Sequence, residues 1–237
     1  MKEPLFFTFE GGEGVGKTTV INRVAEKLKE QGIDVLVTRE PGGSRIAELI
    51  RNLILDKKNT DRDPRTEALL YAASRRQHLV EVILPALKKG TTVLCDRYID
   101  SSLAYQGYAR GLGINEIMSI NQFAIDKARP DLTFFLDLSP EEGLKRIQSQ
   151  RQNEINRLDL EALDFHHKVH EGYRILCEKD PERILRIDAS KNVEACSSYN
   201  THINNALSAV PEFQKKQSCG RCLSALWTEK RTSEGNG

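Results

Sequence analysis

The sequence predicts an α/β fold in which a parallel sheet carries helices on both faces. Short apolar runs alternate with helix-like segments along most of the chain, and this alternation is typical of βαβ units with right-handed crossovers. A glycine-rich turn follows the first apolar run directly and precedes the first helix-like segment. In open α/β sheets ligands bind at the carboxyl ends of the strands, so we expect the functional residues there.

The first half of the chain gives the elements in a regular order. The run Leu5-Phe6-Phe7 predicts a strand, and the apolar spacing from Val20 to Leu28 predicts a helix that ends near Gly32. A short buried strand is expected over 34–38, and Pro41-Gly42-Gly43 predicts a sharp turn after it. Two helices follow, over 46–54 and from 64 to about 89, and Pro85 is expected to kink or break the second.

The second half continues the alternation. Residues 105–113 are punctuated by glycine and predict a loop, and Ser139 with Glu142 predicts a capping box at a helix start. The polar stretch 148–157 has few apolar anchors, so we expect it to be mobile when the site is empty. Residues 214–237 are polar and aperiodic, which is typical of a disordered tail. Further strands are expected over 91–96, 132–138 and 184–188, with helices near 117–124 and up to residue 179.

Composition favours a single domain with almost no net charge. The 237 residues are 39% hydrophobic, and the 35 basic and 34 acidic residues nearly cancel, so the net charge favours neither nucleic acid nor a membrane surface as a partner. No apolar run is long enough to cross a bilayer, and we expect a cytoplasmic protein. The five cysteines are an odd number at irregular spacing, which predicts reduced thiols rather than a disulfide framework.

The glycine-rich turn fits the phosphate-binding pattern G-x-x-x-x-G-K-[ST], known as the P-loop. Glycines let the backbone curl around a polyphosphate, so that its N–H groups and the following helix N-terminus face the negative charge. Lys17 is expected at the β- and γ-phosphates, and the Thr18 hydroxyl at Mg²⁺. The fold is therefore expected to be a three-layer sandwich of the P-loop NTPase type. The predicted ATP-binding residues are Gly11, Gly12, Glu13, Gly14, Val15, Gly16, Lys17, Thr18 and Thr19.

Residues suited to a phosphate acceptor follow later strands. Thr91 to Asp96 is an apolar strand that closes on an aspartate, the form of a Walker B segment, and Asp96 is expected to orient Mg²⁺ directly or through water. Guanidinium groups bind phosphate oxygens in bidentate fashion, and Arg39 and Arg97 both lie just beyond predicted strand ends. The candidate acceptor arginines are Arg39, Arg51, Arg75 and Arg97.

Four motifs together resemble the bacterial thymidylate kinase family. They are Phe9 to Thr19 with the P-loop, Thr38-Arg39-Glu40-Pro41-Gly42-Gly43, Asp96-Arg97-Tyr98 with Ser101-Ser102 and Tyr105-Gln106-Gly107, and Asn156-Arg157-Leu158-Asp159. They occur in the order typical of the family and cover residues 5 to about 195. The P-loop alone would indicate only a superfamily, whereas its combination with the other motifs is specific.

The resemblance implies an activity and an assembly. The expected reaction is the transfer of the γ-phosphoryl group of Mg-ATP to dTMP, which gives dTDP for dTTP biosynthesis. The family is homodimeric, so a homodimer is expected. The acceptor phosphate is itself the nucleophile, so positioning and charge neutralisation are expected to carry catalysis without a general base.

The resemblance also implies roles for individual residues. Glu13 is expected to bind the 3′-hydroxyl of the nucleotide sugar, and Tyr71 to stack on the thymine, where phenylalanine is more usual. Tyr105 is expected near the 2′ position, where its bulk disfavours ribose. The remaining substrate-binding residues are Arg75, Gln106 and Ser101 at the base and Arg39, Arg51 and Arg97 at the acceptor phosphate.

A lid is expected to complete the site. Gly14 stands where some relatives carry a P-loop arginine, so the family resemblance implies that a lid over about 147–158 supplies the catalytic charge. Arg151 is our choice for that role and Arg157 the second. The predicted catalytic residues are thus Lys17, Arg97, Arg151 and Glu13. We expect a kinase domain over 1–210 and an atypical tail over 211–237.

Two further patterns do not predict a site. His166 and His170 have the spacing of a helical metal pair, but we interpret them as a solvated helix face. We interpret Cys219 and Cys222 as a CxxC pair without a zinc or redox role.

Three alternative functions differ from this one in the motifs they need. A deoxynucleoside kinase would act on an uncharged hydroxyl, whereas this chain offers arginines at the acceptor edge. A GTP-dependent switch would carry N-K-x-D, and no such motif occurs. A non-catalytic nucleotide-binding module remains open.

Overall fold

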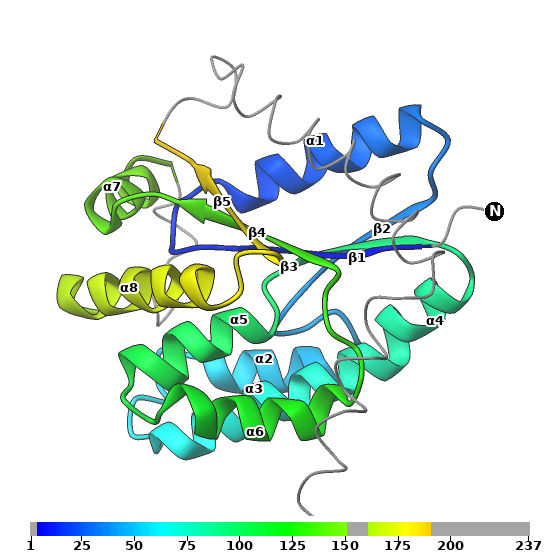
Figure 1. Cartoon of the computed structure of the whole chain (residues 1–237). Helices are drawn as coiled ribbons and strands as arrows, with labels where there is room; N and C mark the ends of the chain where they lie inside the picture. Colours follow the sequence, from blue (N-terminus) through cyan, green and yellow to red (C-terminus); the bar gives the residue numbers. More distant parts are fainter. Residues whose placement is uncertain (1–3, 151–160, 191–237) are drawn as a thin grey trace, which may run out of the picture. The chain divides into compact units, whose positions relative to one another are not determined.

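The computed structural model describes residues 4–150 and 161–190, all within one compact unit. At its centre is a five-stranded sheet in the order β2-β3-β1-β4-β5, in which every pair of neighbours is parallel (Figure 1). The predicted parallel α/β fold is confirmed. The strands are β1 (Phe6–Glu10), β2 (Val35–Arg39), β3 (Thr92–Asp96), β4 (Leu132–Asp137) and β5 (Ile184–Asp188).

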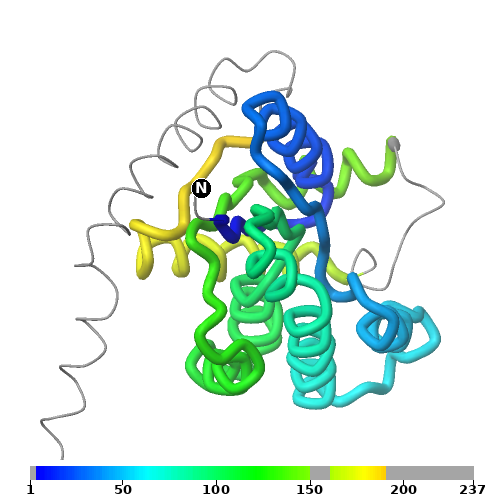
Figure 2. The backbone as a smooth tube through the Cα atoms, turned by 90° about the vertical axis from the view of Figure 1, so that its right-hand side faces the viewer, coloured from blue at the N-terminus to red at the C-terminus, as the bar shows by residue number. Residues whose placement is uncertain are grey.

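Helices cover both faces of the sheet. Helix α1 (Lys17–Glu30) lies on one face and buries its apolar positions from Val20 to Leu28 there, whereas α5 (Ile99–Ser102), α6 (Ile114–Ile125) and α8 (Leu163–Lys179) lie on the other (Figures 1 and 2). A core of aromatic and aliphatic side chains, including Phe135, Val169 and Tyr173, fills the space beneath α8. The other helices are α2 (Arg45–Leu55), α3 (Pro64–His78), α4 (Leu84–Lys88) and α7 (Pro140–Gln150).

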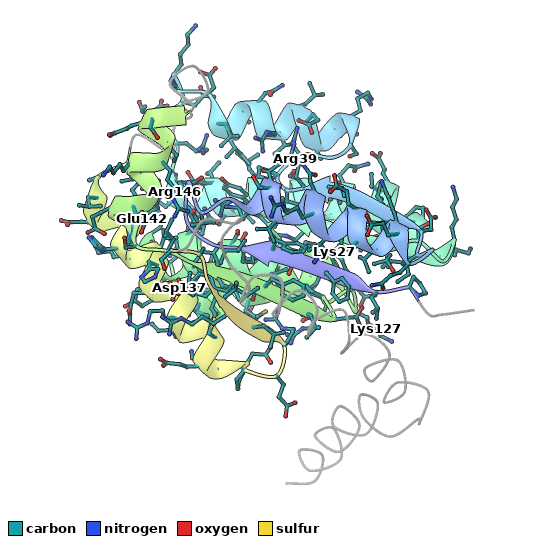
Figure 3. All side chains as sticks on the ribbon, turned by 90° about the horizontal axis from the view of Figure 1, so that it is seen from above. Lys27, Arg39, Lys127, Asp137, Glu142 and Arg146 are labelled. Atoms are coloured by element: carbon teal, nitrogen blue, oxygen red, sulfur yellow. The ribbon has the colours of Figure 1, made fainter. Side chains whose placement is uncertain are left out.

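The strand register gathers the predicted functional segments at one edge. Asp96, the last residue of β3, lies opposite Arg39 of β2 and opposite Phe9 of β1. The loops that leave these three strands therefore start side by side at the carboxyl edge, where α/β folds bind ligands. In Figure 3, Asp137 at the end of β4 lies near Glu142 and Arg146 of α7, and Lys127, which precedes β4, lies toward the opposite end.

Several predicted helix ends are confirmed. The Asp63 side chain accepts hydrogen bonds from the backbone N–H groups of residues 65 and 66, with Pro64 at the first helical position of α3. Ser139 Oγ accepts from the Glu142 N–H, as the capping box predicts. Gly32 takes a positive φ just after α1. Within the described ranges, no helix combines the length and apolar character that crossing a bilayer requires.

The strand expected to be buried over 34–38 is instead partly exposed. Among the strands of residues 4–150 and 161–190, β2 lies at the edge of the sheet with β3 as its one neighbour, and Val37 keeps 42% of its surface exposed. An apolar run of five residues cannot distinguish a central strand from an edge strand, because that difference depends on where the chain places the neighbouring strands.

Two π-helical segments replace expected features. The interruption predicted at Pro85 begins earlier, as η1 (Leu79–Ile83), in which the Leu84 N–H donates to the Leu79 carbonyl and the chain enters α4 before the proline. The predicted loop over 105–113 is wrong in its first half, because η2 (Leu103–Ala109) forms there. Ala104 packs so closely on Gly172 of α8 that a Cβ on that glycine would lie 3.1 Å from the Ala104 Cα. The packing of η2 on α8 therefore outweighs the tendency of the glycines in this segment to form a loop.

Candidate active site

The P-loop connects β1 to α1 through a backbone that needs glycine. Gly11, Gly14 and Gly16 have φ values of 141°, 69° and 88°, in the region that favours glycine. Two of them also lie against other backbone, because a Cβ on Gly14 would lie 2.1 Å from the Gly143 carbonyl oxygen and one on Gly11 would lie 2.6 Å from the Leu136 carbonyl oxygen. The loop is therefore seated on the end of β4 and the first turns of α7.

Lys17 opens α1 and folds back over this loop. Its Nζ donates to the Gly12 carbonyl oxygen at 3.0 Å and to that of Gly11 at 3.3 Å. Burial and then the neighbouring charge of Arg97 lower the pKa of Lys17, against the opposing effect of Asp96 and Glu13. The first turn of α1 holds no acidic side chain, so its N–H groups and this ammonium make the loop a site for anions.

A cavity of about 310 Å³ extends from the P-loop to the turns after β2 and β3. Of the predicted site residues that the structure describes, Gly11, Gly12 and Arg75 lie away from its wall, and the others line it. Arg151 and Arg157, the predicted lid arginines, and the Cys219–Cys222 pair lie outside the described residues. Predicted residues on the wall are Glu13, Gly14, Val15, Gly16, Lys17, Thr18, Thr19, Arg39, Arg51, Tyr71, Asp96, Arg97, Ser101, Tyr105 and Gln106.

Arg97, which directly follows β3, lines the cavity next to the P-loop. It has a φ of 69°, which is uncommon for a residue other than glycine and recurs at functional sites. Its Nη2 donates to Glu13 Oε1 at 2.8 Å, and its guanidinium lies 5.0 Å from the centre of the Tyr105 ring. The Tyr105 hydroxyl donates to the same Glu13 oxygen at 2.9 Å. The P-loop carboxylate is thus joined to both Arg97 and Tyr105.

Two carboxyl groups three residues apart have opposite pKa shifts. Burial, with a contribution from Asp100, raises the pKa of Glu10 from 4.5 to about 7. Burial acts in the same direction on Glu13, but the charges of Arg97 and Lys17 outweigh it and lower the pKa of Glu13 to about 2. Glu13 is therefore an anion throughout the physiological range, and Glu10 is a buried group that titrates near neutrality.

Glu10 holds the turn that carries Arg97. It accepts hydrogen bonds from the Tyr98 N–H at 2.7 Å, from the Tyr173 hydroxyl at 2.9 Å and from Ser101. The Tyr173 hydroxyl also contacts Arg97 Nη1 at 3.4 Å. Sequence reasoning missed Glu10 and Tyr173. The position of Glu10 at the end of an apolar strand could have indicated it, because a buried carboxyl group needs hydrogen-bond partners. Tyr173 is one of two Phe or Tyr residues on α8 and has no local signal.

The turn after β2 is fixed by arginines. Arg39 Nη1 and Arg51 Nη1 both donate to the Pro41 carbonyl oxygen, at 3.0 Å and 2.8 Å. Arg39 also pairs with Glu48 at 3.0 Å. The two guanidinium groups therefore lie side by side next to the cavity, an arrangement that suits an anion with several oxygens.

Arg75 lies behind the cavity wall in this structure, and its contact with the base stays a prediction. It is fully buried, and its guanidinium donates to Glu40 Oε2 at 2.8 Å and to the Tyr98 carbonyl oxygen at 2.9 Å. It also bonds to Ser102 and Asn121. In this structure Arg75 ties the turn after β2 to the turn after β3, which the sequence could not indicate because its partners are spread over residues 40–121.

Other side chains around the site differ from expectation as well. Arg146 and Ile147 of α7, together with Glu40 and Ser102, line the cavity and were not predicted. His166 was expected on a solvated face but is buried, because that face of α8 packs into the core.

The site could hold Mg²⁺ through a small set of oxygen ligands. The Thr18 and Asp96 side chains both belong to residues that line the cavity beside Lys17, and hydroxyl and carboxylate oxygens suit this cation. Within the described ranges, no group of three or more histidine, cysteine, aspartate or glutamate residues forms a metal cage. This donor set fits Mg²⁺, which commonly binds one or two protein groups together with substrate phosphates.

Comparisons with known proteins agree on one family. A model of the family described as thymidylate kinase matches residues 9–199. The chain is 62% identical to a thymidylate kinase of Geobacillus sp. (strain WCH70) over 80% of its length and 90% of the relative, and 59% identical to one of Bacillus velezensis over 90% and 97%. It also resembles the crystal structure of thymidylate kinase from Ehrlichia chaffeensis, with 33% identity and a TM-score of 0.67 over 86% of this chain and 98% of that one.

Proposed function

Because the chain belongs to the thymidylate kinase family, we propose that its cavity holds ATP at the P-loop and dTMP at the wall around Arg97. The enzyme phosphorylates dTMP to dTDP with ATP as the phosphoryl donor. One observation carries the placement of the two nucleotides: the P-loop and the cluster of Glu13, Arg97 and Tyr105 face a single cavity of about 310 Å³. The two substrates can then meet without a covalent intermediate.

Each wall has a part in the transfer. Lys17 and the N–H groups at the start of α1 bind the donor phosphates and neutralise charge on the transferred group. Arg39, Arg51 and Arg97 hold the acceptor phosphate, whose oxygen is the nucleophile. Glu13 accepts from the 3′-hydroxyl of dTMP while it keeps Arg97 in place, since its pKa of about 2 leaves it free to accept hydrogen bonds.

The base and sugar are proposed to lie deeper in the same wall. Tyr71 stacks on the thymine, Gln106 and Ser101 contact its edge, and Tyr105 disfavours a 2′-hydroxyl. Arg75 supports this wall from behind through Glu40 and Tyr98. Four of the five N–H groups of its guanidinium donate to Glu40, Ser102, Asn121 and Tyr98, and we propose that the fifth contacts the base.

Mg²⁺ is the proposed metal ion. Thr18 and Asp96 would hold it, and when bound it would supply positive charge that offsets the charge of the donor phosphates. Arg151 directly follows α7, whose Arg146 and Ile147 line the cavity. We therefore keep Arg151, with Arg157 second, as the proposed lid arginine in a lid over about 147–158.

A panel of nucleoside monophosphates tests this assignment. We expect ADP release with Mg-ATP to be fastest with dTMP and to stop when EDTA removes the metal. AMP and CMP should be poor acceptors. Turnover with AMP or CMP equal to that with dTMP would overturn the assignment of the acceptor site.

A homodimer is also proposed, in which α2, α3 and α6 form the interface. Large apolar side chains on these helices are exposed, foremost Phe123 of α6 at 92%, with Leu49 and Leu69 on the other two. Apolar patches of this kind mark association surfaces. Sedimentation should give a dimer at micromolar concentration, and Phe123→Asp should shift it toward monomer. A wild-type monomer would contradict the proposal.

Domain limits and location complete the proposal. We propose a kinase domain over 1–210, supported by the family match over 9–199, with a tail over 211–237 that lies outside the described residues. We also propose that the enzyme works in the cytoplasm, because Cys95 and Cys177 are free thiols and free thiols are usual in a reducing compartment.

A further inference from the structure

We propose that Glu67 fixes the orientation of the Gln106 side-chain amide, and that this orientation makes the site accept thymine or uracil and reject cytosine. The inference rests on the proposed placement of the base at Gln106. It adds a positioning residue, Glu67, that determines which bases the enzyme accepts.

The two side chains are buried and hydrogen-bonded to each other. Glu67 of α3 and Gln106 of η2 are 3% and 2% exposed. Gln106 Nε2 donates to Glu67 Oε1 at 3.0 Å, and Glu67 Oε2 accepts from Arg62 Nη2 at 3.0 Å. A carboxylate only accepts hydrogen bonds, whereas an amide has one accepting and one donating end. The Gln106 nitrogen must therefore face Glu67.

Glu67 is itself held firmly in place. Arg62, its ion-pair partner, also donates to the carbonyl oxygens of Leu53 and Ile54 at the end of α2, at 3.1 Å and 3.0 Å. Arg110 Nε lies 3.8 Å from Glu67 Oε1 on the other side. Two guanidinium groups favour the ionised carboxylate, so Glu67 keeps its role as an acceptor.

The fixed amide leaves a defined edge for a ligand. Gln106 lines the cavity, and in the part of the chain that the structure describes its Oε1 makes no hydrogen bond. Nε2, bonded to the same carbon as Oε1, keeps a second N–H beyond the one that donates to Glu67. The amide therefore offers an acceptor and an adjacent donor in a fixed order.

That order matches one kind of pyrimidine. Thymine and uracil carry an N3–H donor beside carbonyl acceptors, whereas cytosine has an N3 acceptor beside an amino donor. An amide can pair with either edge, but only by turning over between them. If Gln106 turned over, its carbonyl oxygen would face the Glu67 carboxylate with no proton between them. Bound cytosine would thus leave buried polar groups without hydrogen-bond partners. A site built to hydrogen-bond its substrate strongly rejects an analogue that does so.

The substitution Glu67→Gln tests the inference, because the new amide can donate or accept and so releases Gln106. The readout is the ratio of kcat/KM for dTMP to kcat/KM for dCMP. We expect this ratio to fall by roughly 10-fold or more, partly through a gain with dCMP. A loss of packing alone would lower both values together and leave the ratio unchanged.

Arg62→Gln is the matched control. It removes the same ion pair but leaves Glu67 to accept from Gln106, so it should lower thermal stability and keep the ratio near that of the wild type. In the double variant Glu67→Gln, Gln106→Glu, the amide at position 67 donates to the carboxylate at position 106. That carboxylate still offers an acceptor to the N3–H of the base. The double variant should restore the preference for dTMP, and it remains informative where the single variant folds poorly.

Gln106→Ala separates the role of Gln106 from that of Glu67. If it leaves the ratio unchanged, Gln106 does not read the base and both that placement and the inference are overturned. If it lowers the ratio while Glu67→Gln does not, the placement stands and the role of Glu67 is overturned. A double variant that keeps the low ratio would also contradict the inference.

Discussion

The side of the cavity formed by the P-loop, where we propose ATP, is the donor wall, and the side around Arg97, where we propose dTMP, is the acceptor wall. The two walls differ in what fixes their shape. On the donor wall the backbone does so: Gly11 and Gly14 lie directly against carbonyl oxygens of β4 and α7, and Lys17 bonds to the loop's own carbonyl groups. On the acceptor wall side chains do so: Glu10, Glu13 and their partners hold the turn that carries Arg97.

This difference predicts different sensitivities. The donor wall should tolerate few added atoms, because backbone that touches backbone cannot move aside. The acceptor wall should respond to changes in charge and hydrogen bonding, because its side chains form one connected network. The following substitutions test the two expectations, beginning with the largest effect on turnover.

Lys17→Ala should have the largest effect. It removes the one side-chain charge that the P-loop sequence directs at the transferred group, so we expect turnover to fall by roughly 100-fold or more. Initial rates at saturating ATP and dTMP measure this. Lys29→Ala, at the far end of the same helix, is the control and should keep normal rates. Near-normal turnover of Lys17→Ala would contradict the donor assignment.

Arg97→Ala should act mainly through dTMP. It removes charged hydrogen bonds to the acceptor phosphate, so kcat/KM for dTMP should fall by about 10- to 100-fold. The KM for ATP should change little. Arg97→Lys keeps the charge but not the guanidinium fork, so it should lie between wild type and alanine.

The control for Arg97 is Arg65→Ala on the outer side of α3, which should behave as wild type. A dTMP saturation curve of Arg97→Ala that matches the wild type would remove this residue from the acceptor site. A larger change in the KM for ATP than in that for dTMP would instead place Arg97 nearer the donor.

Gly143→Ala tests the donor wall by adding a single methyl group. The new Cβ would lie 2.3 Å from the Glu13 carbonyl oxygen, so the P-loop or α7 must shift. Alanine is otherwise the better helix residue by about 1 kcal/mol, yet overpacking of this kind costs about 1–3 kcal/mol. We expect lower thermal stability and roughly 10-fold lower turnover, since small misplacements of reacting groups are costly.

Gly32→Ala is the control for that variant. Its Cβ would have no neighbouring atom within 4 Å and its φ is 74°, so it carries only the strain of the left-handed conformation, about 1–2 kcal/mol. It should lose stability without losing turnover. A Gly143→Ala enzyme with normal turnover would show that the tight seat of the P-loop on α7 is not needed for catalysis.

The same comparison explains which parts the sequence could predict. The P-loop was predictable because glycine, lysine and threonine occur at local spacing and each follows from backbone geometry. The parallel sheet was predictable because strands and helices alternate, which requires crossovers. The π-helical form of η2 and the exposure of β2 were not, because both depend on distant neighbours, such as Gly172 beneath Ala104.

The sequence predicted which residues form the acceptor wall better than it predicted the contacts between them. The family resemblance named Arg97, Tyr105 and Gln106, and all three line the cavity. It did not indicate Tyr173, which reaches the wall from a helix more than 70 residues away in sequence. Arg75 is buried behind the wall. There its N–H groups donate to Glu40, Ser102, Asn121 and Tyr98, because a buried guanidinium needs acceptors for its five N–H groups.

Glu10→Gln should have the smallest effect on turnover and the clearest effect on pH dependence. Its pKa rises from 4.5 in the unfolded chain to about 7 in the fold. Between these values the folded protein keeps a proton that the unfolded chain has lost, so the free energy of unfolding falls as the pH rises. The interval from 4.5 to about 7 corresponds to on the order of 3 kcal/mol.

Glutamine has the same shape and cannot titrate, so the variant should lack this decline. Denaturant unfolding of both proteins from pH 4.5 to 7 measures the difference. Glu13 does not interfere, because its pKa is lowered to about 2 and the stability it contributes is lost only as the pH falls below 4.5. If the free energy of unfolding changes with pH in the same way in both proteins, Glu10 is already ionised in the fold. The ionised carboxylate, and not the protonated acid, would then hold the turn that carries Arg97.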